Sequence, residues 1–280
     1  MDEFFEKIRF RNNDFFVLRD DLIGGEFNGN KARKLEYFLK ADLSTFKSIT
    51  STGSSQSNAM SALSVFARLK GLEFFYIPTH ISDFLRNNPC GNYEIALKNG
   101  MKITDKIPQN SLFIPQGVAC NEAQIGFKTQ ADLILNFMKK NNIVFDIFLP
   151  SGTGASTCFL AKNLSCCDVF TTPCVGSAEY LQKQIFALDA ASKVKILSPA
   201  LKCYFGDLKR EFFEIWRELE ITTKIRFELI YDPLGWLTLL ANLKFFKKPI
   251  LYIHQGGLSG LSSQLARYER KFGALAKVYI

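Results

Sequence analysis

Histidine is nearly absent from this chain, since its 280 residues include only His80 and His254. A metal centre built on imidazole ligands is therefore not predicted, and His254 is expected to be a structural residue at a strand end. The seven cysteines show no Cys-x-x-Cys spacing, and the neighbours Cys166 and Cys167 could hardly pair with each other. We expect no metal and no disulfide framework, but reduced thiols in a reducing compartment.

Several catalytic signatures are also missing. No Gly-x-Ser-x-Gly elbow of a hydrolase occurs. The glycine-rich run Ser151–Thr157 lacks the Gly-Lys-Ser/Thr ending of a phosphate-binding Walker loop. It is not a dinucleotide fingerprint either, because Thr157 stands where the third glycine would be. Cys158 follows this run, and a small buried apolar filler is its expected role rather than a reactive thiolate.

Long apolar runs and clustered charge are lacking as well. No run approaches membrane-spanning length, and the first residues alternate acids with aromatics instead of forming a signal peptide. The net charge is +8, but the basic residues are scattered and no nucleic-acid-binding motif appears. With 47 % hydrophobic residues and a mean hydropathy of +0.01, the chain can bury a large core. We expect a cytoplasmic protein that binds neither membranes nor nucleic acids.

Short apolar runs alternate with longer helical patterns along the whole sequence. The predicted strands are 46–51, 73–78, 111–115, 144–150, 168–173, 193–198, 225–231 and 249–254. The predicted helices include 56–70, 122–140, 178–190 and 208–219. This alternation is typical of βα units, so the sequence predicts an α/β fold with parallel twisted sheets flanked by helices.

Three predicted strands end in turns rich in small or polar residues: Gly53–Asn58, Ser151–Thr157 and His254–Gly257. Ligands of open α/β sheets gather at the carboxyl ends of strands, so these turns are candidate binding loops. The second is the best candidate anion site, because its small residues let several backbone N–H groups converge at a helix N-terminus. An ordinary βα turn would have the same composition.

Lys31 lies in the frame Gly29-Asn30-Lys31-Ala32-Arg33-Lys34. A lysine forms an imine only when its charge is suppressed, and neighbouring cations favour its free amine. Arg33 and Lys34 are expected to supply those cations, although Asp20 and Asp21 could pair with either of them. The alternative is a solvated lysine at a helix start.

Together these segments resemble the fold-type II pyridoxal-phosphate enzymes, and among them the 1-aminocyclopropane-1-carboxylate deaminase and D-cysteine desulfhydrase family. The resemblance runs from Val17–Leu22 through Gly29–Tyr37 to Gln56-Ser57-Asn58, with looser matches at Ser151–Thr157 and His254–Gly257. It implies a tryptophan-synthase-β-like fold that holds pyridoxal 5'-phosphate between two domains. Residues 1–44 plus 142–280 would form the larger domain, and residues 45–141 the smaller, inserted one.

The resemblance also implies roles for individual residues. Lys31 matches the Schiff-base lysine and Asn58 the partner of the cofactor's phenolic oxygen. Ser57 matches a serine beside the substrate carboxylate or the reacting carbon, and Gln255 a residue near the ring nitrogen. The implied phosphate loop is Thr153, Gly154, Ala155, Ser156 and Thr157. The implied substrate contacts are Ser54, Gln56, Ser57, Tyr231 and Trp236.

The chain departs from this family at Asp232-Pro233, which no tyrosine follows. Trp236 could replace a stacking face but not a phenolic proton, whereas Tyr231 or Tyr204 could supply one. We therefore expect elimination or deamination of a small amino acid, with a D-cysteine-like substrate preferred over 1-aminocyclopropane-1-carboxylate. A pyridoxal-phosphate-binding protein with little catalysis, acting in cofactor handling or regulation, is the alternative. By analogy with the family, the protein would be a homodimer.

Overall fold

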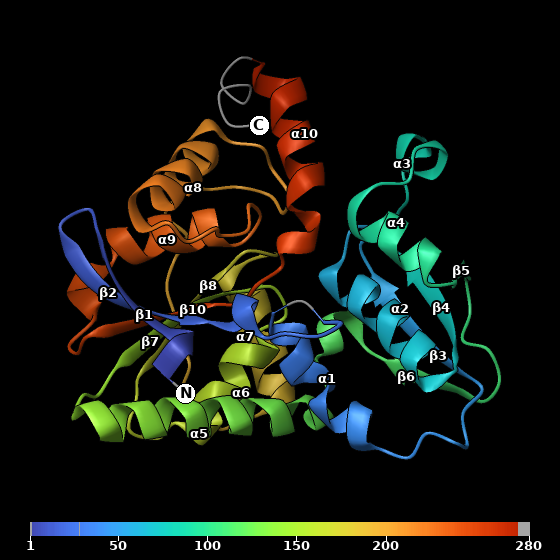
Figure 1. Ribbon diagram of the computed structural model, residues 1–280, viewed down its shortest axis with the longest axis horizontal. Helices are drawn as coiled ribbons and strands as arrows, with labels where there is room; N and C mark the ends of the chain where they lie inside the picture. Colours follow the sequence, from blue (N-terminus) through green and yellow to red (C-terminus); the bar gives the residue numbers. More distant parts are fainter. Residues whose placement is uncertain (1, 28, 274–280) are drawn as a thin grey trace.

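The strands of the structure form two sheets that lie side by side (Figure 1). The computed structural model describes residues 2–27 and 29–273. The larger sheet has the order β1-β2-β10-β7-β8-β9, and the smaller sheet the order β5-β4-β3-β6. Every pairing is parallel except that of β1 with β2, which form a hairpin. The strands are β1 Phe5–Phe10, β2 Asn13–Arg19, β3 Ser48–Gly53, β4 Glu73–Pro78, β5 Met101–Ile103, β6 Ser111–Ile114, β7 Asp146–Ser151, β8 Val169–Pro173, β9 Lys195–Ile196 and β10 Ile250–His254.

Helices cover the faces of both sheets. The α-helices are α1 Asn30–Lys40, α2 Asn58–Lys70, α3 Asp83–Asn87, α4 Gly91–Lys98, α5 Gln124–Asn141, α6 Ala155–Asn163, α7 Ala178–Leu188, α8 Arg210–Thr223, α9 Asp232–Ala241 and α10 Leu261–Phe272. The short 3-10 helices are η1 Asp2–Phe4, η2 Asp20–Leu22, η3 Gln116–Val118, η4 Asn121–Ala123, η5 Leu243–Phe245 and η6 Leu258–Gly260. Within the described ranges, no helix is long and apolar enough to cross a lipid bilayer.

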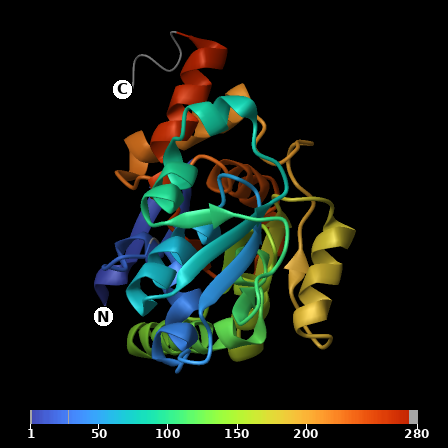
Figure 2. The same cartoon turned by 90° about the vertical axis from the view of Figure 1, so that its right-hand side faces the viewer.

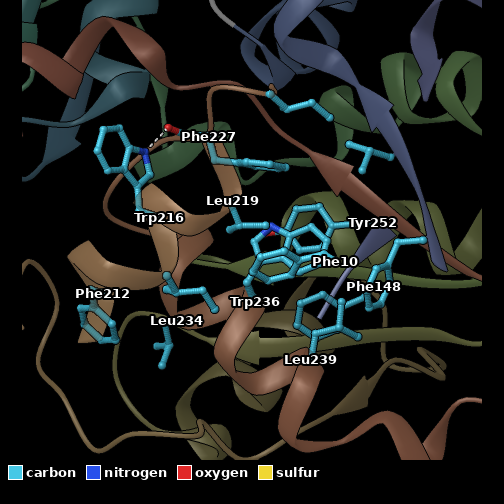
Figure 3. Packing of buried hydrophobic residues seen from close by; sticks show 14 of the residues in the cluster. Phe10, Phe148, Phe212, Trp216, Leu219, Phe227, Leu234, Trp236, Leu239 and Tyr252 are labelled. Carbon is cyan, nitrogen blue, oxygen red and sulfur yellow. Dashed lines mark hydrogen bonds between the residues drawn. The ribbon is translucent and has the colours of Figure 1, made fainter. Parts of the chain in front are cut away.

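The larger sheet separates two hydrophobic cores. Strand β7 is buried along its whole length, and its side chains alternate between the two faces. Phe148 packs into a cluster with Trp216 and Trp236 (Figure 3), whereas Ile147 and Leu149 pack into a second cluster beneath α5 and α6. The smaller sheet has a core of its own around α2. Each sheet therefore has a hydrophobic core of its own, and Leu35 and Phe38 of α1 join the core of the smaller sheet.

The predicted α/β class is confirmed, and β4 has the predicted bounds. The N-terminal hairpin β1–β2 was not predicted. Its turn residues, Arg11 and Asn12, both have positive φ values of 45° and 63°, as the tight hairpin turn requires. Glycine, the usual signal for such a turn, is absent there.

The predicted strand 225–231 is wrong. The carbonyl of Arg226 accepts a hydrogen bond from Nε2 of His254 at 2.9 Å, which gives His254 the structural role expected of it. The backbone N–H groups of Ile230, Tyr231 and Asp232 donate to the carboxylate of Glu228. Because these polar groups are satisfied locally, the segment has no need of a neighbouring strand.

Candidate active site

A cavity of about 210 Å³ opens at the carboxyl ends of the strands, between the two sheets. Figure 2 shows the smaller sheet facing the viewer. Three segments line most of the cavity: Ser54–Ala59 after β3, the turn from β7 into α6, and Gln255–Gly257 after β10. These are the three turns singled out in the sequence. Parallel strands bring their carboxyl ends to one edge, so both sheets deliver polar turns to the same place.

Lys31 is the second residue of α1, and the start of this helix is fixed against the end of β10. The backbone N–H of Asn30 donates to the carbonyl of Gln255 at 2.8 Å. Gly29 has a φ of 58°, and a Cβ there would lie 2.0 Å from the same carbonyl oxygen. Only glycine fits this close approach. The Gly-Asn-Lys frame is thus what places the amine of Lys31 in the cavity, where it donates to Oδ1 of Asn30 at 2.7 Å.

The pKa of Lys31 is lowered to about 8, mainly because its surroundings desolvate the ammonium group. The carboxylate of Glu228 opposes this effect and raises the pKa. The predicted contribution of Arg33 is wrong, because its guanidinium is buried against Asp20 at 2.7 Å and is therefore paired. Lys34 donates to the carbonyl of Gly117 at 2.6 Å, and burial holds its own pKa well below the ordinary value. Desolvation is thus the main cause of the lowered Lys31 pKa, and the repulsion between Lys31 and Lys34 also lowers the pKa of Lys34.

The N-terminus of α6 opens into the cavity. Gly154 precedes this helix in the left-handed conformation, with a φ of 74°, and contributes no capping side chain. The first N–H groups of the helix therefore remain available to an anion. Thr153, Gly154, Ala155 and Ser156 line the cavity, as the phosphate loop requires. Thr157 does not line it, because its hydroxyl is buried 2.7 Å from that of Ser151.

Residues of the smaller sheet form the opposite wall, where Ser54, Gln56, Ser57 and Asn58 all line the cavity. The hydroxyl of Ser57 caps α2 by accepting from the N–H groups of Ala59 and Met60. The side chain of Gln56 is bonded at both ends to the start of α4, through the carbonyl of Cys90 and the N–H of Asn92. These two side chains are held in place before any ligand arrives.

Glu228 is the main lining residue that the sequence did not reveal. Its carboxylate is buried in the segment 225–231 and accepts from three backbone N–H groups. Desolvation raises its pKa to about 7, while the N–H donors and Lys31 oppose the shift. In the sequence, the sign of this role was an acidic residue within the otherwise largely apolar run 225–231. Other unpredicted lining residues include Asn30, Thr79, Gln116, Tyr180, Gln184 and Phe205.

Tyr231 and Gln255 line the cavity as predicted, whereas Trp236 does not. Burial raises the pKa of Tyr231, so its phenol stays protonated and can donate a hydrogen bond. The amide of Gln255 is engaged at both ends, with the carbonyl of Pro150 and with Nδ2 of Asn30, both at 2.8 Å.

The predicted substrate contact at Trp236 is wrong. Its ring is fully buried and stacks on Tyr252 at 4.4 Å between centroids (Figure 3). Asp232 lies one helical turn earlier on α9 and accepts a hydrogen bond from the hydroxyl of the same Tyr252 at 2.6 Å. This face of α9 therefore packs on β10, and Trp236 is directed into the core instead of the cavity.

The thiols and histidines contribute little to this site. Cys158 is buried in the core with its pKa raised to about 11 by burial, in agreement with a filler role. No cluster of three or more histidine, cysteine or acidic side chains suitable for a metal occurs in the described part of the chain.

Comparisons with known proteins agree with this geometry. No model of a known protein family matches the chain. A curated putative 1-aminocyclopropane-1-carboxylate deaminase from Pyrococcus horikoshii is 25% identical over 281 residues, covering 88% of this chain and 85% of the relative. A solved structure described as an ACC deaminase homologue matches with a TM-score of 0.71 at 21% identity, covering 90% of this chain and 88% of its own.

A second solved structure extends the comparison. It is described as a pyridoxal 5'-phosphate-dependent aspartate racemase and matches with a TM-score of 0.61 at 12% identity, covering 88% of this chain and 84% of its own. The resemblance predicted from the sequence is thus confirmed, and the chain has the fold of the fold-type II enzymes.

Proposed function

We propose that this protein is a pyridoxal-phosphate-dependent enzyme that carries out elimination or deamination on a small amino acid. One observation carries the proposal: the amine of Lys31, with its pKa lowered to about 8, shares a cavity with the open N-terminus of α6. An imine-forming amine and an anion site in one cavity match an aldehyde that carries a phosphate. The similarity to a putative deaminase supports the reaction class.

The donors of the cavity fit each polar group of this cofactor. Lys31 would hold the aldehyde carbon, and the N–H groups from Thr153 to Ser156 would bind the phosphate. Asn58 would donate to the phenolic oxygen and Gln255 would face the ring nitrogen. The side chain of Thr157 is not among these phosphate-binding groups, because its hydroxyl is buried against that of Ser151. In this proposal residues 1–44 and 142–280 form the larger domain and residues 45–141 the smaller, except that α5 packs in the core of the larger sheet and belongs with the larger domain.

When bound, pyridoxal phosphate withdraws electrons from the substrate α-carbon and so acidifies its proton. Lys31, whose amine is free above about pH 8, would accept that proton. The hydroxyl of Ser57 and the N-terminus of α2 would hold the substrate carboxylate, with Ser54 and Gln56 beside them. Tyr231, whose phenol stays protonated, would donate a hydrogen bond to the leaving group.

The proposed substrate is small, neutral in its side chain and D-cysteine-like, in preference to 1-aminocyclopropane-1-carboxylate. The wall formed after β3 carries hydroxyls and amides but no charged side chain between Ser54 and Asn58. Ring opening would need further phenolic groups, and no tyrosine follows Asp232-Pro233. Sulfide is a good leaving group and needs less assistance. The homodimer and the cytoplasmic location stay predictions.

The test measures cofactor attachment and product release on the same sample. The protein is mixed with pyridoxal phosphate, reduced with borohydride and digested, and we expect the phosphopyridoxyl group on Lys31. Lys31→Ala should abolish this label, whereas Lys40→Ala, on the exposed side of the same helix, should keep it. Label on another lysine in the wild-type protein would refute the assignment.

Product analysis then separates the two candidate functions and the two substrates. D-cysteine should give pyruvate, sulfide and ammonia, and 1-aminocyclopropane-1-carboxylate should give 2-oxobutyrate and ammonia more slowly. Faster release of 2-oxobutyrate would reverse the substrate preference. Cofactor on Lys31 without product from a panel of small D- and L-amino acids would favour a binding protein with little catalysis.

A further inference from the structure

Asn92, on the first turn of α4, does not line the cavity, yet it contacts two residues that do. It is 3 % exposed. Its backbone N–H donates to Oε1 of Gln56 at 3.0 Å. Its Nδ2 donates to the carbonyl of Gln56 at 3.1 Å and to Oδ1 of Asn58 at 2.7 Å. A single buried residue thus contacts both amides of the cavity wall, that of Gln56 through its backbone N–H and that of Asn58 through its side chain.

These contacts determine the orientation of the Asn58 amide. A backbone carbonyl can only accept, so the atom of Asn92 that faces the Gln56 carbonyl must be its nitrogen. The same nitrogen then donates to Asn58, which must present its oxygen. The Nδ2 of Asn58 is consequently turned the other way, toward Gly257, where an added Cβ would lie 3.0 Å from that nitrogen. Gly257 lines the cavity, so the donor of Asn58 lies on the ligand side.

The side-chain oxygen of Asn92 contacts the part of the molecule that is built on the larger sheet. Oδ1 accepts from the hydroxyl of Ser259 at 2.9 Å, and Ser259 belongs to η6, which follows β10 of the larger sheet. Close approach of the two parts is shown by Gly91, where an added Cβ would lie 2.8 Å from the hydroxyl of Ser263. Asn92 is therefore bonded both to the cavity wall after β3, through Asn58, and to η6 after β10, through Ser259.

We propose that Asn92 is a positioning residue that fixes the amide of Asn58 as a hydrogen-bond donor to an anionic oxygen in the cavity, and that Ser259 holds it there while the two walls are together. The inference rests on the proposed function, in which that oxygen is the phenolic oxygen of the cofactor. Loss of the donor weakens cofactor binding and disfavours the ionised oxygen. The absorbance of the lysine-bound cofactor should then titrate at a higher pH.

The test is a double-mutant cycle that follows two properties of the bound cofactor. The dissociation constant and the pH midpoint of the absorbance are measured for the wild type, Asn92→Ala, Asn58→Ala and the double variant. Removing one hydrogen bond predicts a roughly 2- to 12-fold weaker affinity for Asn92→Ala, with a raised midpoint. The double variant should match Asn58→Ala alone, because Asn92 acts through Asn58. Ser259→Ala should shift both properties in the same direction but by less.

Asn99→Ala is the matched control, since Asn99 ends the same helix and bonds to Ile95 and Arg68 on the side away from the cavity. It should leave affinity and midpoint unchanged. Asn92→Asp conserves the volume but cannot donate, so it should reproduce the weaker affinity if Asn92→Ala does not fold. Additive effects in the double variant, or equal effects at Asn99, would overturn the inference. Absence of cofactor binding by the wild type would overturn the proposed function, and this inference with it.

Discussion

The two walls of the cavity differ in charge and in how their helix termini are satisfied. The side formed by α1, the α6 turn and the segment 225–232 carries Lys31, Lys34, Glu228 and Asp232, and the N-terminus of α6 is uncapped. The side formed after β3 carries hydroxyls and amides, and the N-terminus of α2 is capped by Ser57. Both walls are polar turns at strand ends, yet only the first has ionisable groups with shifted pKa values.

This difference indicates a division of roles. A wall that suppresses the charge of an amine and leaves N–H groups open is suited to hold a cofactor permanently. A wall of neutral donors that are already fixed by neighbouring residues is suited to bind and release a substrate. Changes on the first wall should therefore act on cofactor attachment, and changes on the second wall mainly on turnover, apart from Asn58, which in our proposal donates to the cofactor.

The largest expected effect concerns the pH dependence of Lys31. Its lowered pKa leaves the amine free above about pH 8, and the amine protonates as the pH falls below that value. Relative to a lysine with a pKa of 10.5, roughly 300-fold more free amine is present at neutral pH. Borohydride trapping of pyridoxal phosphate on Lys31, followed by peptide mass spectrometry, should show a midpoint near pH 8.

Glu228→Gln sharpens this test. Because the carboxylate raises the pKa of Lys31, its removal should move the midpoint to lower pH. An unstructured lysine peptide titrated in the same way provides the reference for a solvated amine. A Lys31 midpoint equal to that of the peptide would contradict the role of desolvation.

Gly154→Ala should have the next largest effect, on the cofactor wall. An added Cβ would lie 2.6 Å from Cγ1 of Ile185, and alanine disfavours the φ of 74°. We expect a loss of about 1–3 kcal/mol in stability, together with weaker cofactor binding as the start of α6 shifts. Thermal unfolding and cofactor titration measure the two effects.

Gly71→Ala is the matched control for this substitution. Gly71 has a φ of 68° at the end of α2, and nothing lies within 4 Å of its added Cβ. It should lose some stability through backbone strain alone and keep its cofactor affinity. Equal loss of affinity in both variants would show that general destabilisation, and not the α6 turn, is responsible.

Ser57→Ala tests the substrate wall and should act mainly on turnover. The variant loses the cap of α2, at a cost of about 1 kcal/mol in stability, and the proposed contact to the substrate carboxylate. The cofactor should stay bound at wild-type affinity while kcat/KM falls. Ser82→Ala removes a similar cap from α3, outside the cavity lining, and should leave kcat/KM unchanged. Loss of cofactor from Ser57→Ala would contradict the division between the walls.

Features of the site that depend on local sequence could be predicted. The three strand-end turns and the Lys31 frame are contiguous, and strand ends in parallel sheets converge, so the sequence was sufficient to bring them together. The position of Glu228 in the cavity depends instead on a segment that satisfies its own backbone groups. Its apolar pattern is the same as that of a strand, so periodicity alone could not distinguish the two.

The cause of the lowered Lys31 pKa was equally inaccessible from the sequence. Arg33 and Lys34 are adjacent in the chain, but the long-range partners Asp20 and Gly117 determine where their charges lie. The direction in which Trp236 points depends likewise on the packing of α9 against Tyr252. The sequence left the pairing of Arg33 with Asp20 open as one alternative, whereas the Lys34–Gly117 and Trp236–Tyr252 contacts are assigned only by the folded chain.

Trp236→Phe should have the smallest effect, and it tests whether Trp236 of α9 lies outside the cofactor site. The ring lies in the core, where its indole N–H is buried and has no acceptor among the described residues. Phenylalanine leaves a small void, which lowers the free energy of unfolding, but it also removes this unsatisfied donor, which raises it. The two contributions therefore oppose each other. We expect a change in the free energy of unfolding of less than about 1.5 kcal/mol, with cofactor affinity and kcat/KM unchanged. A loss of cofactor absorbance with intact folding would place Trp236 in the site after all, because a residue that acts only through packing should not alter the bound cofactor.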